Sequence, residues 1–454
     1  MAPDVLIAPV ETYDDDRAIR AFVERVLAAT PLVSGGWRDT ARPPLVVVKP
    51  NWVQQAHEFA PDIWEPVITH PALVKAVLTY LAEAMDQRGT IALCDAPNTY
   101  ADFSRILERG GLGAFVADFV AQHPGITLEI IDLRREIWIT KEQVIVERRP
   151  NTPDPRGYTA VNLGRDSLFH GFHGEGRYYG ADYDFAEVNR HHSGEVQEYL
   201  LAGTPMACDL FVNLPKLKTH KKTGITCSLK NLVGINGDKN WLPHHTEGTP
   251  ATGGDEFPEA STKHLVESIV KKVGQRVARS VPMLGPWLFR KMRNAGQRVL
   301  GDSQTTIRNG NWSGNDTCWR MVLDLNRALL YGTAEGGWRA NGLRGYVAII
   351  DGIIGGEGNG PLCPEAVPSG VLIGGWNPAH VDAAASRLMG FDPNRVAMVR
   401  EAFAEHRWPI AMRAMDELVV EDGRRGGEVP LDEVKPATAA GFEPHFGWRA
   451  LRPE

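Results

Sequence analysis

Short apolar runs recur along the chain and predict buried β-strands. Each run is nearly continuous and rich in β-branched residues, as strands are when both faces of a sheet are covered. The runs are centred on Val46, Ile91, Ile130, Val212, Val347 and Val371. We therefore expect a sheet with both faces buried.

Amphipathic segments lie between these runs and predict helices. In Thr69–Gly89 the apolar residues follow a helical spacing, a proline stands in the first turn and a glycine follows the end. Arg17–Thr30 has a similar apolar face, and Asn315–Gly332 has the pattern of a core helix. Alternating strands and helices imply right-handed crossovers and a mostly parallel sheet. The predicted fold class is α/β, with helices flanking the sheet.

Two stretches interrupt this alternation. Residues 150–194 are rich in Gly, Asp, His and Tyr, which predicts a long irregular excursion. Residues 263–298 combine a helical pattern with nine Lys and Arg against one Glu, and include the apolar patch Val281–Phe289. The predicted organisation is an N-terminal α/β lobe over 1–240, a basic helical insert over 241–314 and a C-terminal α/β lobe over 315–454.

Composition narrows the class of protein. The chain has 454 residues, 43% of them hydrophobic, and a formal net charge of -7. These values predict a globular protein and argue against a nucleic-acid partner, so any anion binding must be local. The first residues have neither the basic region nor the apolar core of a signal peptide, and no apolar run approaches the roughly 18 residues of a membrane span. We expect a cytoplasmic protein, and the oligomeric state stays open.

A cluster of cationic side chains follows the run at Val212. If the chain stays extended beyond Pro215, then Lys216, Lys218 and His220 share one face, with neighbours about 6.6 Å apart. Two ammonium groups at that spacing repel by roughly 2.5 kcal/mol at an effective dielectric near 20, and by about 0.6 kcal/mol in bulk water. The cluster is therefore either a solvated basic turn or a site that binds a phosphate or carboxylate.

The segment after this cluster is suited to presenting backbone N–H groups to an anion at a helix start. Four of its side chains are candidates for substrate binding, namely Thr226, Ser228, Lys230 and Asn231. The phosphate-loop pattern G-x-x-x-x-G-K-[ST] is absent, so the segment is not a loop of that kind.

Polar residues also end other apolar runs. Lys49 and Asn51 follow the first run, Asp95 follows the second, and Asp351 follows the run at Val347. In open parallel sheets, ligands bind beyond the carboxyl ends of the strands. We therefore expect these residues to meet Lys216 at one edge of the sheet and to bind substrate there.

The segment Asp351–Pro364 is dense in glycine, which allows a ligand to approach the backbone closely. Asp351 and Glu357 are candidate ligands for Mg²⁺ or another hard cation, because such cations take oxygen ligands. Asn359 is a candidate substrate contact. A flexible surface loop explains the glycines as well.

Histidines form a further signal. Three pairs stand in polar contexts, namely His170 and His173, His191 and His192, and His244 and His245. Surface side chains are the default interpretation of these pairs, and metal ligation is the alternative. His220 is a better candidate for acid–base work, because the neighbouring ammonium groups would tune its pKa.

Six motifs occur in a recognisable order along the chain. They are KPNW from Lys49, THPALV from Thr69, NLPKLKTH from Asn213, TGITCSLKNLVG from Thr223, DGIIGGEGNGP from Asp351 and NPAHVDAAASRLMGFDP from Asn377. Together they resemble the bacterial and archaeal family called domain of unknown function 362. The family residues matched here are Lys49, Asn51, Asp95, Lys216, Lys218, His220, Lys230, Asn231, Asp351, Glu357, Asn359 and Asp382. The resemblance implies a location for a site without implying its chemistry.

Many members of that family carry ferredoxin-like cysteine clusters. The cysteines here are widely scattered, at Cys94, Cys208, Cys227, Cys318 and Cys363. Their spacing contains no local C-x-x-C motif and fits reduced thiols. An iron–sulfur cluster is therefore not supported by the sequence.

These observations predict an enzyme that acts on a small anionic metabolite in a cleft between the two lobes. His220, Lys218 and Asp351 are the predicted catalytic residues, and a divalent cation such as Mg²⁺ is a candidate cofactor. Group transfer, ligation and elimination all suit these groups. Two other hypotheses stay open: a redox accessory protein like the cluster-bearing relatives, and a ligand-binding or membrane-surface scaffold that uses residues 263–298.

Overall fold

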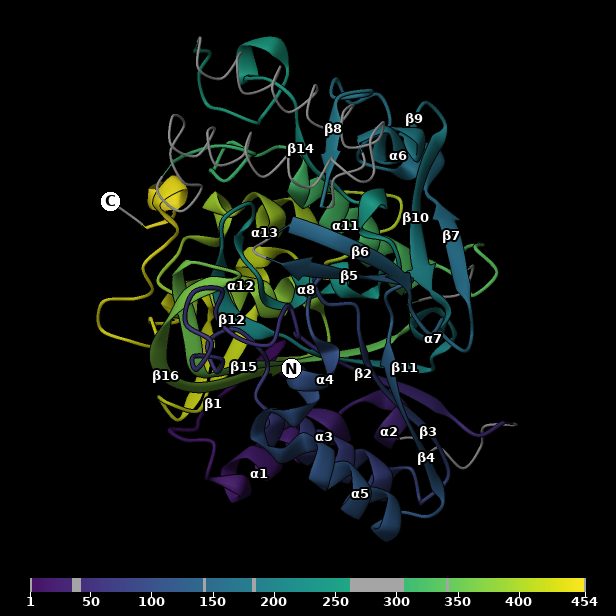
Figure 1. Cartoon of the computed structure of the whole chain (residues 1–454). Helices are drawn as coiled ribbons and strands as arrows, with labels where there is room; N and C mark the ends of the chain where they lie inside the picture. The colour runs from purple at the N-terminus through teal and green to yellow at the C-terminus, as the bar shows by residue number, and fades with distance from the viewer. Residues whose placement is uncertain are drawn as a thin grey trace.

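A mixed β-sheet runs through the centre of the protein (Figure 1). The computed structural model describes residues 2–34, 42–141, 144–181, 185–261, 306–339 and 343–452. Within these ranges the sheet has 11 strands, nine of them in the order β18-β17-β1-β16-β15-β11-β2-β3-β4. The other two are β12 (Lys216–His220), which pairs with β15, and β13 (Gly224–Ile225), which pairs with β12.

The middle of the sheet is parallel. Its strands are β15 (Gly345–Asn359), β11 (Leu210–Leu214), β2 (Leu45–Pro50), β3 (Gly89–Asp95) and β4 (Ile126–Asp132). Each is parallel to its neighbour in this order. The predicted α/β fold with a mostly parallel sheet is therefore confirmed, and the carboxyl ends of β2, β3 and β11 lie at the same edge.

Antiparallel pairs extend the sheet on one side. These strands are β16 (Cys363–Gly375), β1 (Val5–Pro9), β17 (Val419–Asp422) and β18 (Gly427–Pro430). Strand β1 lies between β16 and β17, and β11 lies beside β15. Strands from 1–240 and from 315–454 thus interleave in one sheet. The predicted lobe boundaries stay a prediction. One continuous sheet contains strands from both predicted lobes, so a cleft between the lobes would not separate two sheets.

Helices cover both faces of the sheet (Figure 1). On one face lie α1 (Asp16–Ala28), α3 (Pro71–Ala84), α4 (Phe103–Glu108) and α5 (Leu112–Gln122). On the other lie α8 (Cys227–Asn231), α11 (Cys318–Tyr331), α12 (Pro378–Leu388) and α13 (Ala397–Ala402). Alternate residues of a strand face opposite sides, so Val46 and Val48 join the first layer and Val47 the second. No described helix combines the length and the apolar character that a membrane span requires.

The helices predicted from apolar spacing are present with somewhat shorter ends. Helix α3 begins at Pro71, whose missing N–H costs nothing in the first turn. The Nδ1 atom of His70 accepts a hydrogen bond from the N–H of Ala72 at 3.1 Å and caps the same turn.

The glycine-dense segment after Asp351 belongs to a strand. Strand β15 continues to Asn359, which pairs with Cys363 of β16. A Cβ atom on Gly352 would lie 2.9 Å from the Leu217 side chain, and one on Gly356 would lie 2.8 Å from the Pro66 carbonyl oxygen. The alternative of a flexible surface loop is therefore wrong, because these glycines make room for β12 and a neighbouring loop.

The excursion 150–194 holds more regular structure than its composition suggests. It contains β7 (Tyr158–Asn162), β8 (Tyr178–Gly180), α6 (Phe185–Arg190) and β9 (His192–Ser193). Strands β7 and β9 pair with β10 (Val196–Ala202), and β8 pairs with β14 (Pro243–Thr246). Buried aromatic rings supply the missing aliphatic core, as in Phe169 and Tyr178, whose centroids are 5.2 Å apart.

Strands β5 (Glu136–Lys141) and β6 (Val144–Pro150) form a separate hairpin. The basic segment 263–298 and its apolar patch 281–289 lie outside the described residues.

Candidate functional site

A buried polar network joins the carboxyl ends of β2 and β3 to α8. The Nζ atom of Lys49 lies 2.7 Å from Oδ1 of Asp95 and donates to Oδ1 of Asn231 at 3.0 Å. The other Asp95 oxygen accepts from the backbone N–H of Trp52 at 2.8 Å. The structure thus brings together Lys49 and Asp95, two of the strand-end residues that we expected to meet at one edge of the sheet, and adds Asn231 to them.

Asn51 joins this network through its amide nitrogen. Its Nδ2 donates to Oδ1 of Asn231 at 2.8 Å. The Lys49 ammonium can only donate, so the Asn231 side chain must turn its oxygen toward Lys49. Because that oxygen is an acceptor, Asn51 must turn its own amide nitrogen toward it. The Oδ1 atom of Asn51 is left buried without a donor among the described residues.

Gly234, which follows α8, closes over the ion pair of Lys49 and Asp95. A Cβ atom at this position would lie 2.0 Å from the Asp95 Oδ1 and 2.6 Å from the Lys49 Nζ. Only glycine leaves space there for both charged groups.

Lys216 has a complete set of internal partners. Its Nζ donates to Oδ2 of Asp351 at 2.9 Å and to the hydroxyl of Tyr13 at 2.8 Å. Asp351 also accepts from the Tyr13 hydroxyl and from the backbone N–H of His70, each at 2.8 Å. All of these distances describe a satisfied, buried ion pair. Lys216 and Asp351 therefore meet as predicted, but neither offers a free group to a ligand.

Lys218 has no such partner. Its side chain is 0% exposed, and its Nζ donates to the carbonyl oxygens of Val67 at 2.5 Å and Pro361 at 3.5 Å. Among the described residues no carboxylate lies within ion-pair distance of it. Burial lowers the pKa of Lys218 well below its usual value, and the charges of Lys216 and Lys230 lower it further.

Lys230 is a second buried lysine without a carboxylate partner among the described residues. It is 7% exposed, and its Nζ has neither a hydrogen bond nor an ion pair with any described residue. Burial lowers its pKa, and so does the nearby charge of Lys49. In turn, Lys230 is the strongest charge acting on His220 and His244, whose pKa values are lowered mainly by burial. We call Lys218, His220, Lys230 and His244 the cation cluster.

The two histidines of the cation cluster offer opposite ring atoms. Nδ1 of His220 accepts the backbone N–H of Lys222 at 3.0 Å, so the neutral ring carries its proton on Nε2. Nδ1 of His244 lies 2.9 Å from the Leu242 carbonyl oxygen, which can only accept, so that ring carries its proton on Nδ1. His244 therefore presents an unprotonated Nε2, whereas His220 presents an N–H donor. Of the acid–base work predicted for His220, this tautomer offers proton donation rather than proton acceptance.

The start of α8 binds a carboxylate of the protein itself. Asp382 of α12 accepts from the N–H groups of Ser228 and Leu229 at 2.7 and 2.9 Å. Burial raises the pKa of Asp382 to about 7, and these hydrogen bonds oppose the rise. The expected N–H donors of this turn are therefore occupied. The Thr226 hydroxyl, by contrast, is buried without a partner among the described residues.

Asp351 and Glu357 do not form one cation site. They stand six residues apart on β15, a separation of roughly 20 Å along a strand. Glu357 instead accepts the N–H of Glu443 at 2.7 Å. In the described ranges no group of three or more His, Cys, Asp or Glu side chains could hold a metal ion. Asn359 ends β15 and lies partly exposed near β12.

The remaining histidine pairs are structural where their contacts are described. His191 lies between Glu198 and Glu187, at 2.8 and 3.1 Å, and His192 bonds to the Trp241 carbonyl oxygen at 2.9 Å. These contacts point in different directions, so the pair does not converge on one metal.

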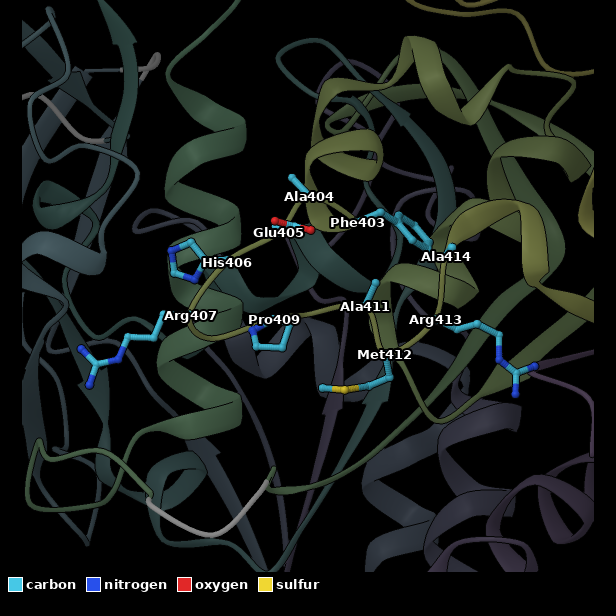
Figure 2. A pocket seen from close by; sticks show the side chains of 10 residues that line it. All are labelled: Phe403, Ala404, Glu405, His406, Arg407, Pro409, Ala411, Met412, Arg413 and Ala414. Atoms are coloured by element: carbon cyan, nitrogen blue, oxygen red, sulfur yellow. The ribbon is translucent and has the colours of Figure 1, made fainter.

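A cavity of about 710 Å³ lies away from all of these residues (Figure 2). The loop that follows α13, residues 403–414, lines it. Figure 2 shows Arg407 and Arg413 on opposite sides of this cavity. Each is engaged, Arg407 with Asp166 at 3.2 Å and Arg413 with Asp4 at 2.9 Å. None of the predicted site residues contributes to this cavity.

Some residues of the site carried little signal in the sequence. Tyr13 gave none, because it precedes an acidic run far from every motif. Gly234 was one glycine among many, and His244 was noted only as a member of a pair. Asp382 was reached through the family resemblance alone, because its partner helix is distant in the sequence.

Together, the parallel sheet and its polar strand ends define an α/β protein with a buried cationic site. The family described as Domain of unknown function (DUF362) matches residues 117–387. This match spans more than half of the chain, so the chain belongs to that family, as the motifs predicted. No curated protein and no solved structure matches the chain.

The other hypotheses stay predictions. All five cysteines are free and buried, which neither supplies a cluster site nor tests the redox hypothesis. The scaffold hypothesis depends on residues 263–298, which lie outside the described residues.

Proposed function

We propose that this protein is an enzyme that binds a small anionic metabolite at the cation cluster. One contrast carries the proposal. The buried lysines Lys49 and Lys216 each have a carboxylate within 2.9 Å, whereas Lys218 and Lys230 have none among the described residues. Burying an ammonium without a counter-charge is strongly unfavourable. An anionic ligand would supply the missing charges.

The two lysines have distinct surroundings that suit distinct roles. Lys230 has no partner among the residues that the structure describes and would bind the negative group of the ligand directly. Lys218 is held by two carbonyl oxygens and has a strongly lowered pKa, so it exchanges a proton more easily than an ordinary lysine does. In our proposal Lys218 contributes to charge binding and to proton transfer.

The histidines complete the polar reaction site. His244 offers a neutral ring with an unprotonated Nε2, which can accept a proton. His220 offers an N–H donor from Nε2, which suits an oxygen of the ligand. The open acceptor on Asn51 suits a ligand hydroxyl. These groups serve group transfer, ligation or elimination, and a divalent cation remains a prediction without a described ligand set.

Incubation with a mixed extract of small metabolites tests this proposal. We expect the purified full chain to consume at least one anionic metabolite and to release a product, as followed by mass spectrometry. A Lys218→Met/Lys230→Met variant should leave that metabolite unchanged. Lys435→Met is the matched control, because Lys435 is exposed and remote from the cluster in the sequence. Equal turnover by the double variant and the wild type would refute the proposal.

A further inference from the structure

Among the described residues, two lysines at the cation cluster lack a carboxylate partner and one hydroxyl lacks a hydrogen-bond partner, and these three side chains narrow the chemical class of the ligand beyond its being an anion. Lys218 belongs to β12 and Lys230 to α8, so two ammonium groups approach the site from different elements. The backbone N–H of Thr226 donates to the Lys218 carbonyl oxygen at 2.9 Å, which places the unpartnered Thr226 hydroxyl beside the same strand. Lys230 and Thr226 are both more than nine-tenths buried.

The cations nearest to this site are lysines. After burial, the groups that lower the pKa of His220 most are Lys230, Lys221, His244 and Lys218, and no arginine is among them. Lysine commonly binds phosphate as a point charge, whereas the planar arginine fork matches carboxylates and phosphates alike. Single donors from several directions match the oxygens of a tetrahedral anion.

The charge of the ligand gives a second, independent criterion for its chemical class. Two buried ammonium groups lack a carboxylate among the described residues, so one singly charged carboxylate would neutralise only half of them. A phosphate monoester carries about -1.5 to -2 charges at pH 7 and has three strong acceptor oxygens. Its three acceptor oxygens match in number the two ammonium groups and the Thr226 hydroxyl.

We infer that the ligand of the cation cluster is a phosphate monoester rather than a carboxylate, with its phosphoryl oxygens bound by Lys218, Lys230 and Thr226. This inference rests on the proposed function and narrows its substrate class. It does not involve Ser228 and Leu229, whose N–H groups already bind Asp382.

Calorimetric titration of the full chain with four probes tests the inference. The probes are inorganic phosphate, glycerol 3-phosphate, succinate and acetate, all at pH 7 and the same ionic strength. We expect the two phosphates to bind at least tenfold more tightly than the two carboxylates. If succinate or acetate binds as tightly as phosphate does, the inference fails and the proposed anion site stands. If none of the four binds, both fail.

Variants assign the binding to these residues. Lys230→Met should weaken phosphate binding at least tenfold, whereas Lys435→Met should leave it unchanged. Thr226→Val keeps the side-chain shape and removes only the hydroxyl, so it should fold and weaken phosphate binding several-fold. It serves as the second test if Lys230→Met does not fold. Unchanged phosphate affinity in a folded Lys230→Met or in Thr226→Val would overturn the assignment.

Discussion

Lys216 and Lys218 stand two residues apart on the same strand and are equally buried, yet only Lys216 has a carboxylate partner in the described structure. The Nζ of Lys216 lies 2.9 Å from Asp351, whereas the Nζ of Lys218 meets only the carbonyl oxygens of Val67 and Pro361. The same strand thus holds one lysine with a carboxylate partner and one that, in our proposal, binds a ligand.

Replacing Lys218 should therefore stabilise the protein. We expect Lys218→Met to raise the free energy of unfolding at pH 7 by about 1–2 kcal/mol, because an uncompensated charge leaves the core. Denaturant unfolding measures this change. Lys216→Met is the matched comparison, and it should lose about 3–5 kcal/mol, because it leaves Asp351 buried without its cation.

The stability gained in Lys218→Met should also depend on pH. Burial lowers the folded-state pKa of Lys218 below that of the unfolded chain, near 10.4. Between these two pKa values the unfolded chain binds more protons, so this lysine makes wild-type stability rise with pH. The advantage of Lys218→Met should shrink as the pH rises toward 10. A gain that is independent of pH would contradict the lowered pKa of Lys218. A loss of stability with phosphate binding intact would show that Lys218 has a structural role.

The ion pair of Lys49 and Asp95 should behave as a unit. Lys49→Met leaves Asp95 buried and unpaired, so we expect a loss of about 3–5 kcal/mol in unfolding free energy. The double variant Lys49→Met/Asp95→Asn should recover part of this loss, because no unpaired charge remains. Additive losses in a double-mutant cycle would argue against the pairing.

Gly234 should tolerate no side chain. We expect Gly234→Ala to destabilise the protein by about 3 kcal/mol or more, because its Cβ would overlap Asp95 Oδ1 at 2.0 Å. Gly113 of α5 is the control, because a Cβ there meets nothing within 4 Å. Gly113→Ala should stabilise the chain by about 0.4–1 kcal/mol. Similar melting temperatures for the two variants would contradict the close packing at Gly234.

Anion binding should be linked to proton uptake. Burial lowers the pKa values of Lys218 and Lys230, and a bound dianion would raise them. The complex then holds more protons than the free protein, so affinity should fall as the pH rises from 6 to 9. Sulfate is a suitable probe because it does not titrate in this range. Calorimetry in buffers of different ionisation enthalpy should show net proton uptake, and affinity that rises with pH would contradict the linkage.

Much of the fold could be predicted from the sequence, because apolar runs such as that at Val46 and helical spacing such as that in Thr69–Gly89 are local signals. The error at Asp351–Pro364 arose because glycine favours loops on average, whereas here it makes room for a neighbouring strand. That neighbour, β12, is set by tertiary packing that no local pattern reports.

The sequence predicted which strand ends carry the polar residues of the candidate site, but it did not predict how their side chains pair. The polar residues after β2 and β3 do meet, because parallel strands end at one edge of a sheet. Which lysine pairs with which carboxylate could not be predicted, because partners such as Lys216 and Asp351 come from distant parts of the chain. The sequence therefore could not distinguish the paired Lys216 from the unpaired Lys218, nor the tautomer of His220 from that of His244.

The most direct test of the central claim is a crystal structure of the full chain grown with selenate, a tetrahedral dianion whose selenium is located by anomalous scattering. We predict a selenium peak whose oxygens lie within hydrogen-bond distance of Lys230 Nζ and near Lys218. Selenate found only at the surface, with a carboxylate of the protein itself bound to Lys230, would contradict the account.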